Sequence, residues 1–183
     1  MSTSLAKHWF STPNLISYSR VVLLLPLGYG IFAQAPVVSF VCFSLIVISD
    51  IYDGKLARRA EILNPNGTRI DHSADAIVVG TTSAILAHQH VALPILPVLI
   101  ALAFLQYIFD GSNFGREPRA SKLGKINGIA YYGYCAICLI SFHVNFSNTL
   151  IENFVITSCG WILVATTCAS IYFRLRQSYS IIE

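Results

Sequence analysis

Four aspartates stand in two pairs near the middle of the chain, in the segment DIYDGKLARRAEILNPNGTRIDHSAD, residues 50–75. Asp50 and Asp53 are three residues apart, and Asp71 and Asp75 are four apart. On a helix either spacing puts both carboxylates on one face, so two neighbouring helices can present four convergent carboxylates. Hard oxygen ligands grouped in this way suit Mg²⁺ or Mn²⁺. The spacing therefore predicts a site for two divalent ions, of the kind used in phosphate chemistry.

The residues between the two pairs suit a phosphorylated ligand. Gly54 and Gly67 allow close approach of the backbone, and Arg58 and Arg59 offer positive charge to a pyrophosphate. Carboxylates beside apolar segments must be paired, hydrated or bound to metal, because burying an isolated charge is costly. Ordinary solvated helix ends explain single charges but not four carboxylates at these intervals. We therefore expect a site that binds metal and phosphate.

The elements that position this segment belong to a membrane protein. The chain has 183 residues, is 55% hydrophobic and only 11% charged, and has a mean hydropathy of +0.63. This composition lies outside the range of soluble globular domains. We predict an all-α integral membrane protein with six transmembrane helices, forming a bundle over residues 21–176 of a single domain over residues 1–183. The apolar stretches cover residues 21–33, 37–48, 76–87, 91–109, 126–142 and 150–173.

The basic residues predict the orientation of these spans. All 12 flank the spans on the same side: before the first, between the second and third, between the fourth and fifth, and after the sixth. By the positive-inside rule, both termini and the aspartate segment face the cytoplasm. In chain order these residues are Lys7, Arg20, Lys55, Arg58, Arg59, Arg69, Arg116, Arg119, Lys122, Lys125, Arg174 and Arg176.

The first twenty residues predict an amphipathic helix at the membrane surface. Trp9 and Phe10 stand beside Lys7 and His8, which is typical of an interfacial segment rather than a cleaved signal peptide. The net charge of +3 is explained by the basic face of the membrane protein. No motif for DNA or RNA binding is present, and we expect no nucleic-acid partner.

The aspartate segment also matches a long signature. Every fixed position of DxxDGxxAR, eight further residues and GxxxDxxxD is present in residues 50–75. The segment resembles the CDP-alcohol phosphotransferase family, also called the CDP-alcohol phosphatidyltransferase family. Residues 13–20 resemble the PNxLTxxR motif at the start of the first span in many members, with Ile16 and Ser17 replacing leucine and threonine. The resemblance implies transfer of a substituted phosphate from a CDP-linked donor to an alcohol, with release of CMP.

The same resemblance assigns roles to individual residues. It implies that Asp50, Asp53, Asp71 and Asp75 hold two divalent cations, Mg²⁺ or Mn²⁺, and that Asp75 is the general base. The implied CDP-binding residues are Asp50, Gly54, Ala57, Arg58, Gly67 and Asp71. One direct displacement suffices, and no Ser-His or Cys-His arrangement suggests a covalent intermediate.

The acceptor is predicted from the basic segment between the fourth and fifth spans. Arg116, Arg119, Lys122 and Lys125 suit the phosphate of a phosphorylated alcohol, although they also suit contact with anionic lipid headgroups. Residues 121–127 partly resemble the corresponding region of phosphatidylglycerophosphate and cardiolipin synthases. We therefore expect CDP-diacylglycerol as donor and glycerol 3-phosphate as acceptor. Phosphatidylglycerol, inositol phosphate, serine, and choline or ethanolamine are the alternative acceptors.

A different class of protein also places carboxylates among membrane helices. A cation transporter binds its ion with such residues, but it needs access from both sides of the membrane. Here the four aspartates and all basic residues are predicted on one side, which favours the enzyme. By resemblance we also expect a homodimer, and we expect a multi-pass protein of a bacterial inner membrane with its site facing the cytoplasm.

Overall fold

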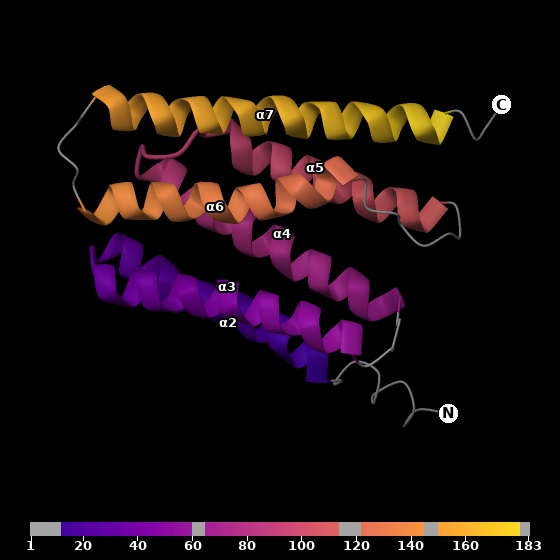
Figure 1. The fold of residues 1–183 in the computed structure, drawn as a ribbon, viewed down its shortest axis with the longest axis horizontal. Coiled ribbons are helices and arrows are strands. Elements are labelled where there is room, and N and C mark those ends of the chain that lie inside the picture. The colour runs from indigo at the N-terminus through magenta and orange to yellow at the C-terminus, as the bar shows by residue number, and fades with distance from the viewer. Residues whose placement is uncertain (1–11, 60–64, 114–121, 145–149, 180–183) are drawn as a thin grey trace. The chain divides into compact units, whose positions relative to one another are not determined.

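The structure is a computed structural model of the chain, and it describes residues 12–59, 65–113, 122–144 and 150–179. Within these residues it is all-helical, which confirms the all-α part of the predicted fold class. In the amino-terminal half the helices are α2 (Thr12–Phe32), α3 (Pro36–Arg59) and α4 (Pro65–His88). In the carboxy-terminal half they are α5 (Ile95–Asn113), α6 (Lys122–Val144) and α7 (Leu150–Tyr179). Figure 1 labels all of them.

Several of these helices suit a bilayer. Three are long and apolar enough to cross a membrane, over Leu15–Phe32, Leu123–Val144 and Asn153–Arg176. Two shorter apolar helices cover Pro36–Tyr52 and Ile95–Phe109. Large apolar side chains such as Leu25 and Ile129 are exposed, as expected where lipid rather than water is the solvent. The six-span topology and the cytoplasmic location of both termini stay predictions.

The first helix begins earlier than predicted. Residues 12–20, assigned from the sequence to a surface segment, belong to α2 and continue without a break into its apolar part. The surface position predicted for residues 1–20 stays a prediction. Ser17 and Arg20, two polar residues of this segment, are buried inside the protein. Residues 1–11, with the predicted interfacial aromatics, lie outside the described residues.

The chain divides into two compact units, residues 1–78 and 79–183, and each is described by itself. In the first unit α2 and α3 form a hairpin and run side by side (Figure 1). Gln34 adopts a left-handed conformation in the turn, with φ 51°, and the amide of Ala35 donates to the carbonyl of Gly30 at 2.8 Å. A Cβ on Gly30 would lie 2.7 Å from Oγ of Ser39. Glycine thus allows the close approach of the two helices at the turn.

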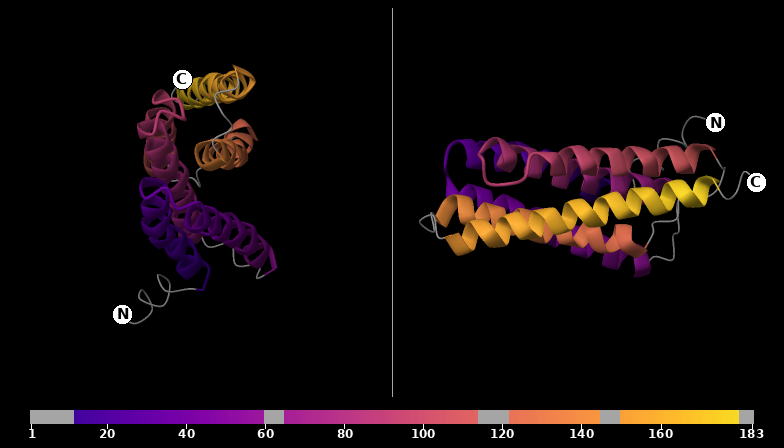
Figure 2. Two further views of the ribbon diagram at one scale, coloured as in Figure 1. Left: turned by 90° about the vertical axis from the view of Figure 1, so that its left-hand side faces the viewer. Right: turned by 90° about the horizontal axis from the view of Figure 1, so that it is seen from above.

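In the second unit α7 packs against both α5 and α6 (Figure 2). The hydroxyl groups of Tyr131 on α6 and Thr167 on α7 are 2.5 Å apart. Nε2 of Gln106 on α5 donates to the carbonyl of Ile171 on α7 at 3.1 Å. Neutral hydrogen bonds therefore join these helices, and they satisfy polar groups that would be costly to bury unpaired.

The prediction of a single domain over residues 1–183 stays a prediction.

Candidate functional site: a carboxylate cluster held by an arginine

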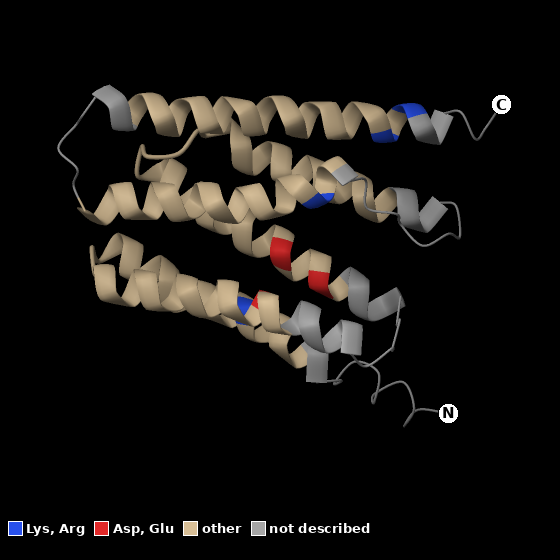
Figure 3. Cartoon of the chain, viewed as in Figure 1, with Lys and Arg blue, Asp and Glu red and all other residues tan. Residues whose placement is uncertain are grey.

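Two helices of the first unit carry the aspartates that the sequence singled out. Asp50 and Asp53 lie on α3, and Asp71 and Asp75 lie on α4, as the spacing predicts. Proline at the first position of each helix fits its start, because proline has no amide hydrogen to leave unpaired there. Figure 3 shows the acidic residues on α3 and α4, and among the side chains that the structure describes they are Asp50, Asp71 and Asp75.

These three side chains, here termed the carboxylate cluster, converge. One carboxylate oxygen from each of Asp50, Asp71 and Asp75 lies within 4.8 Å of the others. The three side chains keep 35%, 35% and 27% of their surface exposed, so the cluster is accessible from solvent. The prediction that two helices present convergent carboxylates is thus confirmed for three of the four aspartates. The side chain of Asp53 lies outside the described residues.

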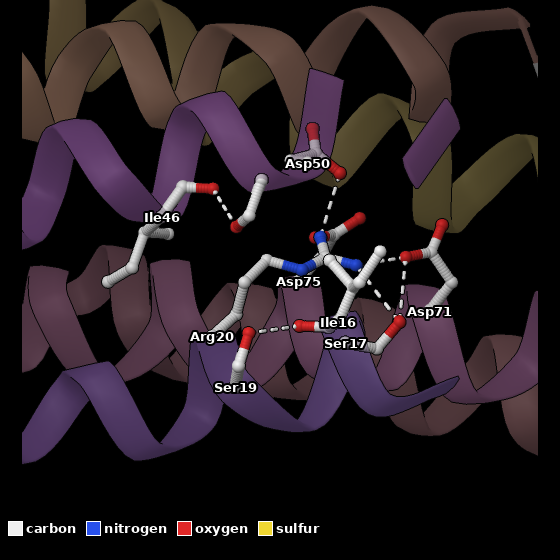
Figure 4. A network of polar contacts seen from close by, with 9 residues as sticks. Ile16, Ser17, Ser19, Arg20, Ile46, Asp50, Asp71 and Asp75 are labelled. Atoms are coloured by element: carbon white, nitrogen blue, oxygen red, sulfur yellow. Dashed lines mark hydrogen bonds and ion pairs between the residues drawn. The ribbon is translucent and has the colours of Figure 1, made fainter. Parts of the chain in front are cut away.

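A buried arginine from α2 lies among these carboxylates. Nη1 of Arg20 donates to Oδ1 of Asp50 at 2.7 Å and also to Oδ1 of Asp75. Nη2 of Arg20 donates to Oδ1 of Asp71 and, at 3.1 Å, to the hydroxyl of Ser17. That hydroxyl in turn donates to Oδ1 of Asp71 at 3.3 Å. Figure 4 shows the arginine reaching all three carboxylates. Three helices are therefore joined through one guanidinium.

The local sequence explains this geometry. Ser17 and Arg20 are three residues apart on α2 and so share a face, as do Asp71 and Asp75 on α4. The planar guanidinium presents several donors in a fixed fork, which suits several carboxylate oxygens at once. The arginine is itself fully buried, at 0% exposure, and a buried charge is tolerated only when it is paired. The carboxylates supply that pairing.

The charge balance of the cluster fits a divalent cation. Three carboxylates contribute −3 and Arg20 contributes +1, which leaves −2 among the described side chains. Clustered carboxylate oxygens that remain partly accessible are the donors that Mg²⁺ and Mn²⁺ prefer. The three aspartates of the carboxylate cluster can therefore hold such an ion.

Sequence reasoning missed Arg20 and Ser17 as site residues. Arg20 was used to orient the first span and as the last residue of a motif, and Ser17 as a substitution within that motif. A signal was present, because both belong to residues 13–20, which resemble the conserved start of the first span in one family. An arginine followed directly by an apolar run is an expensive residue to bury, which also points to a compensating partner.

The other predicted site residues are placed only in part. Gly54, Ala57 and Arg58 lie on α3 and Gly67 lies on α4, in stretches whose side chains are not described. Lys125, in the first turn of α6, has an exposed side chain. Lys122 is the first residue of α6, but its side chain is not among those described. Arg116 and Arg119, the other predicted acceptor residues, lie outside the described residues.

A family model covers most of this chain, and known relatives align with less than half of it. The family model for CDP-alcohol phosphatidyltransferase matches residues 10–171, a range that includes every predicted site residue. A protein of Salmonella choleraesuis (strain SC-B67), named CDP-diacylglycerol–glycerol-3-phosphate 3-phosphatidyltransferase, is 35% identical over 85 residues, which are 44% of this chain and 47% of the relative. A protein of the same name from Salmonella paratyphi A (strain ATCC 9150 / SARB42) is 34% identical over the same shares. The chain thus aligns with about half the length of these relatives. No solved structure matches.

Proposed function

The chain belongs to the CDP-alcohol phosphatidyltransferase family, and on that premise we propose that it transfers a phosphatidyl group from CDP-diacylglycerol to an alcohol, with release of CMP. The observation that carries the proposal is the convergence of Asp50, Asp71 and Asp75 in a cluster fit for a divalent cation. The apolar helices and the family together indicate an integral membrane protein, which suits a lipid-linked donor.

We assign the metal-binding role to Asp50, Asp53, Asp71 and Asp75, with Mg²⁺ or Mn²⁺ as the ions. Bound divalent cations polarise a pyrophosphate and stabilise the negative charge on a departing phosphate. Gly54, Ala57, Arg58 and Gly67, together with Asp50 and Asp71, would bind the CDP portion of the donor. Their places on α3 and α4, the helices that carry the aspartates, support this assignment.

Asp75 is the proposed general base. Its carboxylate would take the proton from the acceptor hydroxyl as that oxygen forms its bond to the phosphorus of the phosphatidyl group. The bond from this phosphorus to the bridging oxygen of CMP breaks in the same displacement, and CMP leaves with the electron pair. In the metal-free protein Arg20 donates to Oδ1 of Asp75 and so holds this carboxylate toward the cluster before an ion binds. A fixed orientation matters because proton transfer needs hydrogen-bond distance to the reacting hydroxyl.

Glycerol 3-phosphate is the proposed acceptor, giving phosphatidylglycerophosphate. The names of the Salmonella relatives support this choice over the other acceptors considered from the sequence. Arg116, Arg119, Lys122 and Lys125 would bind the acceptor phosphate, and the exposed side chain of Lys125 is accessible for that role. We further propose a homodimer in a bacterial inner membrane, with the site facing the cytoplasm.

The proposal is tested with purified protein, CDP-diacylglycerol and Mg²⁺ or Mn²⁺. CMP release is measured with glycerol 3-phosphate, phosphatidylglycerol, inositol phosphate, serine, choline and ethanolamine offered separately. We expect release with glycerol 3-phosphate alone, and its loss in Asp75→Asn. Release with one of the other acceptors would overturn the acceptor assignment but keep the chemistry. No release from CDP-diacylglycerol with any acceptor would overturn the proposed reaction.

A further inference from the structure

Arg20 stands out as a fully buried cation within a candidate membrane span. Its side chain is 0% exposed, and it lies in the span Leu15–Phe32. Burying an arginine among apolar helices is costly unless opposite charges and hydrogen bonds compensate for lost hydration. Both terminal nitrogens of the guanidinium are used on the carboxylate cluster, one carboxylate from α3 and two from α4. The arginine and the cluster therefore stabilise each other.

The same three aspartates are the candidate metal ligands. Without a cation, their carboxylates would repel one another at separations below 4.8 Å. Arg20 removes part of that repulsion, because it contacts one oxygen of each carboxylate. A divalent cation bound to these carboxylates would lie close to the guanidinium, and the two positive charges repel. Both cations would draw on the same three carboxylates.

We propose that Arg20 is the resident counter-ion of the carboxylate cluster and competes with the divalent cation for it. Binding of the ion weakens the contacts from Arg20 to Asp50, Asp71 and Asp75, and loss of the ion restores them. Arg20 is thus a positioning residue that keeps the three helices together in the metal-free protein and lowers the affinity for metal. The inference rests on the proposed function only in taking the cluster as a metal site.

Ser17 extends this arrangement on the α2 side. Its hydroxyl accepts from Nη2 of Arg20 at 3.1 Å and donates to Oδ1 of Asp71 at 3.3 Å. It carries no charge, so it can align the arginine with the carboxylate but cannot compete with a cation. Ser17→Ala therefore removes the group that aligns Arg20 with Asp71 but keeps the charge of Arg20. We expect it to change metal affinity far less than a substitution that removes this charge.

The test is Mn²⁺ binding to the purified full chain in detergent without substrate, followed by the electron paramagnetic resonance signal of free Mn²⁺. Arg20→Gln removes the charge, and Arg20→Lys keeps a charge on a single ammonium without the guanidinium fork. Arg174→Gln is the matched control, because this second arginine of an apolar helix lies over the ring of Tyr107, and none of the carboxylates in the described part of the chain pairs with it. We expect Arg20→Gln to lower the Kd for Mn²⁺ by roughly tenfold or more, since close charge pairs have coupling energies of that order or larger.

Further variants and a second readout complete the test. Arg20→Lys should have an intermediate Kd, whereas Arg174→Gln should have the wild-type Kd. Saturating Mn²⁺ should raise the unfolding temperature more in Arg20→Gln than in the wild type, because the variant lacks its own counter-ion. If Arg20→Gln does not fold without metal, Arg20→Lys replaces it in the test. A Kd for Mn²⁺ below that of the wild type then supports competition, and an unchanged or higher Kd contradicts it.

Two results would overturn the inference. Unchanged or weaker Mn²⁺ binding by Arg20→Gln, with Mn²⁺ bound by the wild type, would show that Arg20 does not compete with the ion; the proposed function would survive. No Mn²⁺ binding by either the wild type or Arg20→Gln would overturn both the inference and the metal-dependent function. These outcomes distinguish failure of the inference from failure of the proposed reaction.

Discussion

Arg20 and Arg174 both lie in apolar helices, but the two units of the chain compensate them differently. Arg20 is fully buried and pairs with three carboxylates, whereas the guanidinium of Arg174 lies 5.5 Å from the centre of the Tyr107 ring. An aromatic face attracts a cation and holds it beside an apolar surface. Three carboxylates instead create a concentrated negative charge that can also bind a metal ion. The kind of compensation thus distinguishes the candidate metal site from a contact between an arginine and an aromatic ring.

The other polar contacts between helices also differ between the two units, being charged in one and neutral in the other. In residues 79–183 the described side chains include no carboxylate, and α5, α6 and α7 are joined by neutral groups such as Tyr131, Thr167 and Gln106. In residues 1–78 the polar contacts between helices centre on charged groups. We therefore expect substitutions in the first unit to affect catalysis most and those in the second to affect mainly stability.

Asp71→Asn should affect activity more than any of the substitutions below affects it. Asp71 accepts hydrogen bonds from Arg20 and Ser17 and belongs to the carboxylate cluster, so its neutral amide would lose both a metal ligand and charge pairing. We expect CMP release to fall by roughly a thousandfold, within the range for loss of a group that acts at the reacting centre. Release is measured at saturating CDP-diacylglycerol and Mg²⁺. A loss smaller than tenfold would contradict a catalytic role for the cluster.

Replacing Arg20 or Arg174 shows how much each arginine contributes to the free energy of unfolding. Arg20→Met should lower the free energy of unfolding of the metal-free protein by about 3 kcal/mol, because it leaves three carboxylates without their counter-ion. Arg174→Met should cost only about 1 kcal/mol, the order of a cation–π contact. Chemical unfolding in detergent with EDTA measures both. Equal losses would show that carboxylates and an aromatic ring stabilise these arginines alike.

Two glycines test how tightly the helices pack. A Cβ on Gly30 would lie 2.7 Å from Oγ and 2.9 Å from the amide nitrogen of Ser39, so Gly30→Ala must push α2 and α3 apart. We expect a loss of about 1–2 kcal/mol in unfolding free energy. Gly133→Ala is the control, because nothing lies within 4 Å of its new Cβ, and alanine should stabilise α6 by about 0.5–1 kcal/mol. Equal changes in unfolding free energy for Gly30→Ala and Gly133→Ala would contradict the close contact at the α2–α3 turn.

Tyr131→Phe should have the smallest effect. It removes the hydroxyl that lies 2.5 Å from Oγ1 of Thr167, but Thr167 still donates to the carbonyl of Leu163 at 2.6 Å. The buried side chain of Asn127 also hydrogen-bonds to Tyr131 and would lose that contact, so the loss in unfolding free energy should be about 1 kcal/mol. CMP release should stay within about twofold of the wild type. A large loss of activity with normal stability would place Tyr131 in the reaction and break the contrast between the two units.

Local patterns in the sequence predicted the helices and the pairing of the aspartates on them. The apolar stretches predicted the helices, and the three- and four-residue spacings predicted that Asp50 and Asp53, and Asp71 and Asp75, share helices. Helix periodicity depends only on neighbouring residues, so a single sequence reveals it. The eight-residue interval and the glycines of the aspartate segment predicted the family in the same way.

The role of Arg20 depends on contacts that no local pattern reveals. Its partner Asp50 is 30 residues away, and Asp75 is 55 residues away, on other helices. A lone arginine near the start of an apolar run fits both the positive-inside rule and a buried ion pair, and hydropathy does not distinguish them. The apolar run predicted a span from residue 21, and the helix that contains it, α2, begins at Thr12.

Metal-dependent CMP release tests the central claim most directly. Purified wild-type protein is given CDP-diacylglycerol and glycerol 3-phosphate, first with EDTA and then with excess Mg²⁺ or Mn²⁺, beside Asp75→Asn under the same conditions. A catalytic carboxylate cluster predicts no release with EDTA, restored release on addition of the ion, and no release by the variant. Release that persists in EDTA, or is undiminished in Asp75→Asn, would contradict the assignment of the reaction to Asp50, Asp71 and Asp75.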